Sequence, residues 1–290
     1  MLNQGLIKEK KMSDNVKYSY FCKGYSAQYK DAPHTGPIPP HTHNAVEFCL
    51  MLSDMQGVLL GTNIVPSKKN TLVIFPEYSV HSVRSYPGKS YKRYVLTVNS
   101  NILKSILEDN YGHYEYLRDS QNPLMIPLND TDCERLFNSM KQLEDSQNEP
   151  IFNQASHLFE TLALIDELVP DNKISKPNTD HLSVSNKTVN CIIEYISNNL
   201  SEPLQVKDIA DKMYLSADYI SKIFKKYTGT TITNYITMQR ISLSRKLLSE
   251  GYSVPEVQEK MGYSSYSYFF RTFKKLVGKT PKEFAMQFKN

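Results

Sequence analysis

The sequence contains few cysteines and lacks any long apolar run. Its four cysteines, Cys22, Cys49, Cys133 and Cys191, lie far apart and form no C-x-x-C pair. This spacing argues against a disulfide scaffold or a zinc ribbon, and it predicts a reducing, cytoplasmic environment. No apolar stretch approaches the ~20 residues that cross a bilayer. No apolar segment follows the lysines near the N-terminus, so we expect neither a membrane partner nor a secretion signal.

Length, composition and charge indicate a folded chain with two unlike parts. Hydrophobic residues make up 40% of the 290 residues and charged residues 22%, so we expect a packed core and about two domains. Residues 187–290 contain 16 Lys/Arg and 9 Asp/Glu, a net charge of +7, whereas residues 1–186 have a net charge of −3. A basic C-terminal third indicates either a polyanionic partner or an ordinary solvated surface.

The first 186 residues change from strand patterns to helix patterns and then to a polar segment. Residues 1–16 are polar without periodicity, which predicts a flexible arm. From about residue 101 the periodicity is helical, around 102–107, 131–145 and 151–169. Residues 170–186 are polar and contain prolines, which predicts a linker. Between residues 17 and 100, short β-rich runs bounded by Pro and Gly predict a sandwich or barrel. These runs are Tyr18–Phe21, Val46–Leu52, Gly57–Ile64, Thr71–Phe75 and Tyr91–Val98.

The C-terminal third contains an internal repeat. The segment FKKYTGTT at 224–231 recurs as FKKLVGKT at 273–280, an offset of 49 residues. Each copy predicts a short helix, a tight turn and a second helix: 205–213 and 217–227 in the first copy, 254–261 and 265–276 in the second. This is the helix-turn-helix plan, whose second helix enters the major groove of DNA. Paired helices also build solenoids, but the basic second helices favour DNA. A long helix over Thr233–Ser249 separates the copies.

One stretch of this region resembles the AraC/XylS family of bacterial transcription regulators. It covers residues 240–284 and reads RISLSRKLLSEGYSVPEVQEKMGYSSYSYFFRTFKKLVGKTPKEF. Arg-Ile, Leu-Leu, Gly-Tyr, Ser-Tyr-Phe, Arg-x-Phe-Lys-Lys, Gly and Thr-Pro stand at the spacings of the family. The resemblance implies an α+β protein with three parts. These are an N-terminal cupin-like β-barrel domain with dimerisation helices over 17–169, the linker 170–186, and an all-α double helix-turn-helix domain over 187–290.

The polar faces of the two second helices predict the surface that contacts DNA. Apolar residues such as Ile220, Phe224 and Phe273 mark the inward face. The resemblance places base contacts on the outward N-terminal turns, where Lys and Arg can bind O6 and N7 of guanine. This selects Asp218, Ser221, Lys222, Tyr266, Ser267 and Arg271 as base-contacting residues, and Lys225, Lys226, Lys274 and Lys275 as phosphate-binding residues. The alternative for each of them is a solvated surface position.

The N-terminal domain contains a group of potential ligand residues. His41, His43 and Glu47 form an H-x-H-x3-E motif, and His81 follows 34 residues later. On a strand, residues two or four apart project from one face. The arrangement resembles the cupin barrel, whose pattern usually has glycines at the positions of two other residues here, Asn70 and Tyr78. Three histidines and one glutamate also suit a transition-metal site.

Three interpretations of this group remain open: an effector pocket, a metal site and purely structural histidines. The resemblance favours a polar effector pocket without a metal or other cofactor, to which Arg84 and Tyr94 contribute. We therefore expect a cytoplasmic transcription regulator, not an enzyme. It would bind double-stranded promoter DNA and a small-molecule effector, with sugars the commonest by resemblance, form a homodimer and contact RNA polymerase. The alternatives are a metal-dependent cupin enzyme with a helical appendage and a regulator without a ligand.

Overall fold

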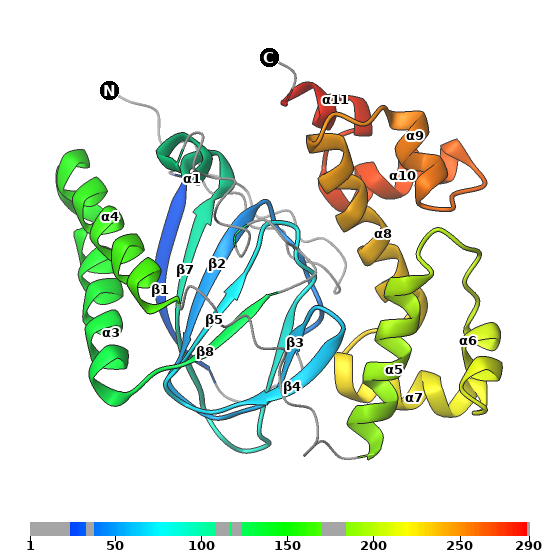
Figure 1. The fold of residues 1–290 in the computed structure, drawn as a ribbon, viewed down its shortest axis with the longest axis horizontal. Coiled ribbons are helices and arrows are strands. Elements are labelled where there is room, and N and C mark those ends of the chain that lie inside the picture. Colours follow the sequence, from blue (N-terminus) through cyan, green and yellow to red (C-terminus); the bar gives the residue numbers. More distant parts are fainter. Residues whose placement is uncertain (1–23, 33–37, 108–116, 118–122, 170–183, 289–290) are drawn as a thin grey trace.

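The computed structural model describes residues 24–32, 38–107, 117, 123–169 and 184–288 (Figure 1). The predicted arm over 1–16 and the predicted run Tyr18–Phe21 lie outside these residues. So does the predicted linker, except for its last three residues, because helix α5 (Val184–Asn198) already begins at Val184. The described N-terminal part consists of two antiparallel sheets with helices on one side, and the described C-terminal part is helical.

The strands form two separate sheets. The five-stranded sheet has the order β1-β7-β2-β5-β8, and its strands are β1 (Tyr25–Ala32), β7 (Tyr91–Asn99), β2 (Ala45–Met51), β5 (Thr71–Phe75) and β8 (Leu124–Pro127). The three-stranded sheet has the order β4-β3-β6, with β4 (Asn63–Ser67), β3 (Met55–Leu60) and β6 (Ser82–Ser85). No ladder of the described residues joins the two sheets into a closed barrel, so the predicted cupin-like barrel is not confirmed.

The strand predictions were right where a run was long and apolar. The predicted runs at 46–52, 71–75 and 91–98 are β2, β5 and β7. The run at 57–64 was predicted as one strand but contains parts of β3 and β4, because the chain turns at Gly61 with a φ of 55°. Strands β1, β6 and β8 were not predicted. Asn70 and Tyr78, at the two positions where the cupin pattern has glycine, have φ values of 58° and 63°.

Both faces of the five-stranded sheet are covered, as the packing of successive side chains along β2 shows. Val46, Phe48 and Leu50 pack in one core with α1 (Ser100–Leu107), α3 (Asp130–Asp145) and α4 (Ile151–Leu168). Cys49 and Met51, on the opposite side, pack with the three-stranded sheet. Side chains alternate across a pleated strand, so Glu47 faces the interior between the sheets and not the helices.

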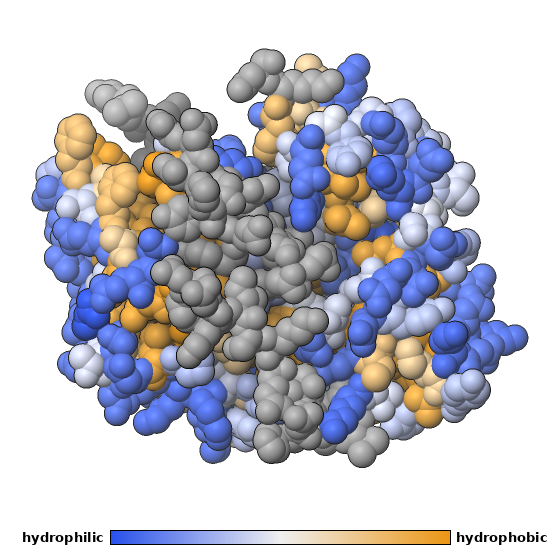
Figure 2. Space-filling model, in the orientation of Figure 1, coloured by the Kyte–Doolittle hydropathy of each residue, from blue (hydrophilic) through white to orange (hydrophobic). Residues whose placement is uncertain are grey.

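Helix α4 also carries apolar side chains that nothing in the described structure covers. Ile151, Phe152 and Phe159 are 68%, 84% and 49% exposed. Figure 2 shows hydrophobic surface at the place that α4 occupies in Figure 1. The opposite face of the helix is buried through residues that include Leu158, Thr161 and Ile165, and the hydroxyl groups of Thr161 and Ser139 on α3 share a hydrogen bond. Helix α4 therefore presents two faces, of which the described chain uses one.

The C-terminal helices form two units around two cores. The first unit contains α6 (Val206–Lys212) and α7 (Ala217–Thr228), and the second contains α9 (Val254–Lys260) and α10 (Tyr266–Val277). Helix α8 (Ile232–Ser249) contributes to both cores, α5 packs in the first, and α11 (Pro281–Met286) packs in the second. All the helices predicted here are confirmed to within a few residues at each end.

The ends of α7 and α10 are fixed by the same residues in the two copies. Ser216 and Ser265 are the N-caps, and each side chain accepts a hydrogen bond from the backbone N–H three residues later. Gly229 and Gly278 end the helices in the left-handed conformation. Both pairs are 49 residues apart, the offset of the sequence repeat. The repeat therefore encodes the boundaries of the two helices as well as their cores.

The turn of the second unit, which contains Gly262, leads to a prediction about the stability of the protein. Gly262 has a φ of 63°, and a Cβ atom there would lie 2.1 Å from the carbonyl oxygen of Ser201. We expect Gly262→Ala to destabilise the protein by at least ~1 kcal/mol, since it combines left-handed strain with a backbone clash. Gly251→Ala is the matched control, because Gly251 has a φ of 96° but open space around it. The urea concentration at the midpoint of unfolding should be lower for Gly262→Ala than for Gly251→Ala. Equal midpoints would contradict the packing of this turn.

The helical units pack directly against the sheet domain. Leu59, Ile64 and Val80 belong to the core of the first unit. The side-chain oxygen of Asn190 on α5 accepts a hydrogen bond from the backbone N–H of Ile64 at 2.7 Å. Tyr78 belongs to the core of the second unit. Both units are thus docked on the same side of the three-stranded sheet (Figure 1). Among the described helices, none is long and apolar enough to span a membrane.

Candidate nucleic-acid interface and histidine cluster

The outward face of α7 presents the residues that the sequence predicted. Asp218, Ser221 and Lys222 are exposed on the first turns of the helix. The ammonium group of Lys222 lies 2.7 Å from the carboxylate of Asp218. The hydroxyl of Ser221 donates to the carbonyl oxygen of Ala217 at 2.7 Å. An exposed i,i+4 pair contributes little to stability, so its main effect is to hold the Lys222 side chain along the N-terminal half of the face.

The outward face of α10 has the same organisation. Tyr266, Ser267 and Arg271 are exposed, and the Nε of Arg271 donates to the carbonyl oxygen of Ser267 at 3.2 Å. Arg271 is 49 residues after Lys222, so the two cationic side chains occupy equivalent positions in the repeat. Each unit therefore offers, at the same position of its second helix, an outward cation that can bind the O6 and N7 atoms of guanine.

The four predicted phosphate-binding lysines lie in the last turns of the two helices. Lys225 and Lys226 on α7 are exposed, as are Lys274 and Lys275 on α10. Sequence reasoning missed Tyr219 and Tyr268, which are exposed near the start of each second helix. They are also 49 residues apart, so the repeat itself was the signal that could have identified them.

The structure brings together the histidines that the sequence singled out. His41, His43 and His81 each offer a ring nitrogen within 4.8 Å of the others. The ring centroid of His81 lies 4.4 Å from that of His41 and 5.0 Å from that of His43. An Oε2 atom of Glu47 lies 3.1 Å from Nε2 of His43 and 3.9 Å from Nε2 of His81. We call these four residues the histidine cluster.

Backbone carbonyl groups orient all three imidazole rings in the same way. The Nδ1 atom of His41 lies 3.1 Å from the carbonyl oxygen of Pro39, that of His43 lies 3.0 Å from Ala45, and that of His81 lies 3.0 Å from Ser79. A carbonyl oxygen only accepts hydrogen bonds, so each Nδ1 carries a proton. In a ring with one proton Nε2 is then an acceptor, so a hydrogen bond from Nε2 of His43 to Glu47 requires a second proton on that ring. Such hydrogen bonds to Nδ1 are the usual support of metal-binding histidines.

Burial sets the charge states in the cluster. It lowers the pKa of His41 and lowers that of His81 well below the ordinary value, because a buried imidazolium loses its hydration. Burial alone would raise the pKa of Glu47. The hydrogen bond with His43 and the potential of the three histidines outweigh burial and hold that pKa well below its usual value. The cluster thus contains one carboxylate facing imidazole nitrogens, a donor set that suits Zn²⁺, Fe²⁺, Ni²⁺ or Co²⁺.

Two residues predicted for the same site lie elsewhere. Arg84 lies in the contact with the first helical unit, where its Nη1 donates to the carbonyl oxygen of Lys226 at 3.1 Å and its guanidinium faces the ring of Tyr227. Tyr94 projects from the helix-covered face of β7, where its hydroxyl group donates to Glu144 on α3. Arg84 lies on β6 of the three-stranded sheet, and Tyr94 lies on the face of β7 that meets the helices. The structure therefore brings neither residue to the histidine cluster.

The interior face of β7 carries a cation that sequence reasoning missed. Arg93 is half-buried, its guanidinium lies 3.9 Å from the ring centroid of Tyr91, and its charge helps to lower the pKa of His41. Within the described residues, Nε and Nη1 of Arg93 and the hydroxyl of Tyr91 have no hydrogen-bond partner. Strand parity could have identified both, since they alternate with Tyr94.

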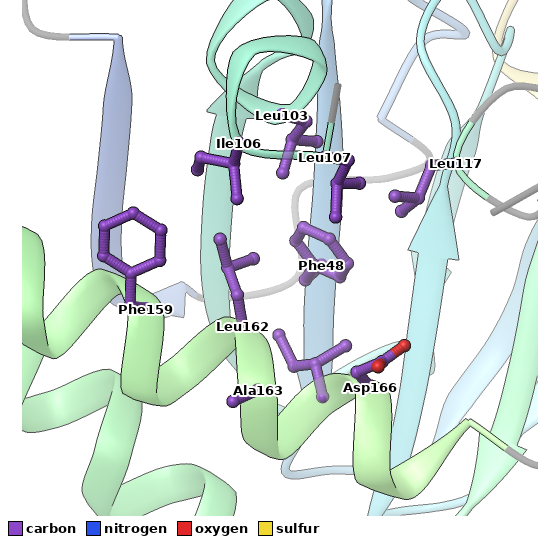
Figure 3. Close-up of a pocket in the computed structure, with 10 residues that line it drawn as sticks. Phe48, Leu103, Ile106, Leu107, Leu117, Phe159, Leu162, Ala163 and Asp166 are labelled. Carbon is purple, nitrogen blue, oxygen red and sulfur yellow. The ribbon is translucent and has the colours of Figure 1, made fainter. Parts of the chain in front are cut away.

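A separate cavity of about 220 Å³ lies on the other face of the five-stranded sheet (Figure 3). Its walls come from β2, α1 and α4 and are almost wholly apolar, with Phe48, Leu103 and Leu162 among them. Asp166 is the charged residue of the lining. No residue predicted for the effector site lines this cavity, which suits an apolar ligand and not a sugar.

Comparisons with known proteins identify the helical region. Residues 209–287 match the family described as "Helix-turn-helix domain". The chain is 33% identical over 117 residues to the regulatory protein PocR of Salmonella typhimurium, which covers 40% of this chain and 37% of PocR. It is 30% identical over 162 residues to the Msm operon regulatory protein of Streptococcus mutans, covering 54% and 57%. It therefore spans between about a third and three fifths of the length of these two relatives.

A solved structure gives a fold comparison over the same region. A transcriptional regulator of Chromobacterium violaceum, described as having an AraC-type DNA-binding domain, is 27% identical with a TM-score of 0.34, covering 37% of this chain and 96% of that one. The C-terminal part of the present chain is a double helix-turn-helix domain. Residues 209–287 of this part match the helix-turn-helix family, which supports the AraC-type domain that the sequence predicted.

Proposed function

We propose that this chain is a sequence-specific transcription regulator that binds promoter DNA through α7 and α10 and responds to an effector in its N-terminal domain. The observation that carries the proposal is the pairing of Lys222 and Arg271 at equivalent, exposed positions of the two units. A single basic patch would suit any polyanion, whereas two equivalent cations on two recognition helices suit the edges of two sets of base pairs.

Selection from randomised DNA duplexes tests this function. We expect the purified full chain to enrich one motif with two conserved elements, separated by about one helical turn of 10–10.5 base pairs. Binding to the selected duplex should exceed binding to a scrambled duplex by at least about 10³-fold. Salt-dependent binding without any enriched motif would contradict the proposal, because it would leave only phosphate contacts.

We further propose that the exposed face of α4 joins two copies of the chain. Ile151, Phe152 and Phe159 of this helix are exposed, and exposed apolar side chains that gather on one surface mark interaction sites. The occupant is a second copy, because a helix face can meet its own symmetry mate with matching side chains.

A charged residue introduced on the exposed face of α4 tests whether this face joins two copies of the chain. We expect Phe152→Glu to raise the dimer dissociation constant at least about tenfold, since two desolvated carboxylates would meet near the twofold axis. Sedimentation velocity over a concentration series measures it. Glu160→Gln, a change of charge at a polar position of the same helix, is the control and should leave the dimer intact. A monomeric wild type, or an unchanged Phe152→Glu dimer, would contradict this surface.

We propose the histidine cluster as the effector-responsive site, which makes it a sensor and not a catalytic centre. The observation in its favour is a set of buried polar groups, including Arg93 and Tyr91, whose hydrogen-bonding capacity the described chain leaves unused. Buried polar groups without partners are unfavourable, so a bound polar ligand would stabilise them. The family resemblance favours a sugar as the effector, whereas the ring nitrogens and the carboxylate of the cluster do not by themselves select one. An effector found in the apolar cavity behind Phe48 would contradict this placement.

A further inference from the structure

The histidine cluster contains more hydrogen-bond acceptors than donors. The three Nδ1 protons are all used by backbone carbonyl oxygens, so Nε2 atoms and carboxylate oxygens face one another. A second proton on His43 would satisfy Glu47 at 3.1 Å. It would still leave Nε2 of His81 without a hydrogen-bond partner in the described chain, and His81 is only 2% exposed. A cation bound among these acceptors would satisfy all of them.

The space among the rings suits an ion and not a sugar ring. The three ring centroids are 4.4, 5.0 and 6.2 Å apart. His81 is held from behind by Phe75, whose ring stacks on it at 4.2 Å. Imidazole nitrogens together with one carboxylate prefer first-row divalent transition metals over Mg²⁺ or Ca²⁺, which prefer oxygen ligands.

The segment that carries His81 also reaches the DNA-binding domain. Residues 76–81 connect β5 to β6, and the backbone N–H of Tyr78 donates to the carbonyl oxygen of His43 at 3.0 Å. The ring of Tyr78 lies in the core of the second helix-turn-helix unit, 4.5 Å from the guanidinium carbon of Arg245. Val80 lies in the core of the first unit. One short segment thus joins the cluster to both units.

The carbonyl group of Tyr78 provides a second link to the same domain. The hydroxyl of Ser242, in the middle of α8, donates to it across the domain contact. Tyr78 has a φ of 63°, a conformation that a residue with a side chain adopts only when its surroundings hold it. A change in the position of His43 or His81 would therefore be felt at α8, the helix that both units share.

We propose that His41, His43, His81 and Glu47 bind one divalent transition-metal ion, and that residues 76–81 transmit its presence to the two helix-turn-helix units through Tyr78 and Val80. This inference deepens the proposed function, because it names the ligand class of the sensor site and the segment that connects the site to the DNA-binding units. Only the effect of the metal on DNA binding rests on the proposed function. Coupling between sites of this kind is typically 5- to 150-fold in affinity.

Titration with Co²⁺ tests the metal site. We expect the chelator-treated chain to bind one Co²⁺ by calorimetry and to develop a visible d–d absorption band. His43→Gln should weaken binding at least about tenfold. His157→Gln is the matched control, because His157 lies on α4 and contacts Glu149 and Glu160; it should bind like wild type. Absence of stoichiometric Co²⁺ binding, or equal affinity in His43→Gln, would overturn the proposal.

A pair of serine variants tests the transmission. Ser242→Ala removes the hydrogen bond to Tyr78, whereas Ser244→Ala, on the same helix and equally buried, removes only a bond to its own helix at Arg240. We expect Co²⁺ to change the DNA dissociation constant at least about fivefold in wild type and Ser244→Ala. In Ser242→Ala the metal should still bind, but the change should fall below about twofold. An equal response in both variants would overturn the route.

Hydrogen exchange separates this inference from the proposed function. We expect Co²⁺ to alter amide exchange across α8 in wild type but not in Ser242→Ala, with no DNA present. If the chain selects no DNA motif but Co²⁺ still alters α8, the proposed function is wrong and the inference stands. If the chain selects a motif but Co²⁺ changes neither exchange in α8 nor DNA affinity, the inference alone is wrong.

Discussion

Replacing Lys222 or Arg271 by alanine is expected to weaken binding to the selected DNA by about 1–3 kcal/mol each and to relax the preference at one base position. Each side chain stands on the outward face of its recognition helix, and the two are equivalent in the repeat. Loss of a base contact also leaves the acceptors of that base unsatisfied, so the effect should concentrate on the cognate sequence. Binding measured on the selected motif and on single-base variants checks both parts.

Lys225→Ala provides the contrast. Lys225 is exposed in the last turn of α7, where we expect contact with phosphate. This change should weaken binding to all sequences alike and reduce the salt dependence by about one ion. Asp218→Ala removes the carboxylate that lies 2.7 Å from Lys222. This change should leave in place the preference at the base pair that Lys222 contacts. If Lys222→Ala and Arg271→Ala select the same motif with the same affinity as wild type, the reading face lies elsewhere.

Acidification is expected to destabilise the metal-free chain below pH 6.5. Burial lowers the pKa of His41 and His81, so the unfolded chain takes up protons at these residues before the folded chain does. Stability therefore falls as the pH falls, by about 1.4 kcal/mol per pH unit for each imidazole that stays neutral when folded. The lowered pKa of Glu47 acts in the same direction at lower pH, because its stabilising charge is lost there.

Urea unfolding at pH 7.5, 6.5 and 5.5 in the presence of a chelator measures this dependence. His81→Phe keeps a ring against Phe75 but cannot take up a proton. Between pH 6.5 and 5.5, the slope of its unfolding free energy against pH should therefore correspond to the uptake of about one proton fewer than in wild type. A slope that is identical in wild type and His81→Phe would show that His81 does not stay neutral when buried.

The helical domain could be predicted closely because its signals are local. Ser216 and Gly229 mark the ends of α7 within the sequence itself, and the repeat shows the same positions again at Ser265 and Gly278. Capping depends on hydrogen bonds within a few residues, so no distant contact is needed to fix it. The outward position of Lys222 follows from the same periodicity.

The strands were predicted less completely for a physical reason. β2 and β7 are buried on both faces, one against helices and one against the second sheet. Such strands carry apolar side chains on both faces, so their sequence does not state which face meets the helices and which meets the second sheet. Tyr94 was therefore assigned to the wrong face, and its neighbour Arg93 was missed. β1, β6 and β8 lack a long apolar run, and their partners in the sheets define them.

By itself, the sequence determined the two helix-turn-helix units, their boundaries, their exposed cations and the membership of the histidine cluster. These follow from spacings of two, four, 34 and 49 residues along one chain. Only the tertiary structure decided that Arg84 contacts Lys226 and that Tyr78 joins the core of the second unit. Both contacts bring together residues more than 140 positions apart, and their existence depends on how two domains dock. No local periodicity encodes that geometry, because it arises from the shapes of two complete surfaces.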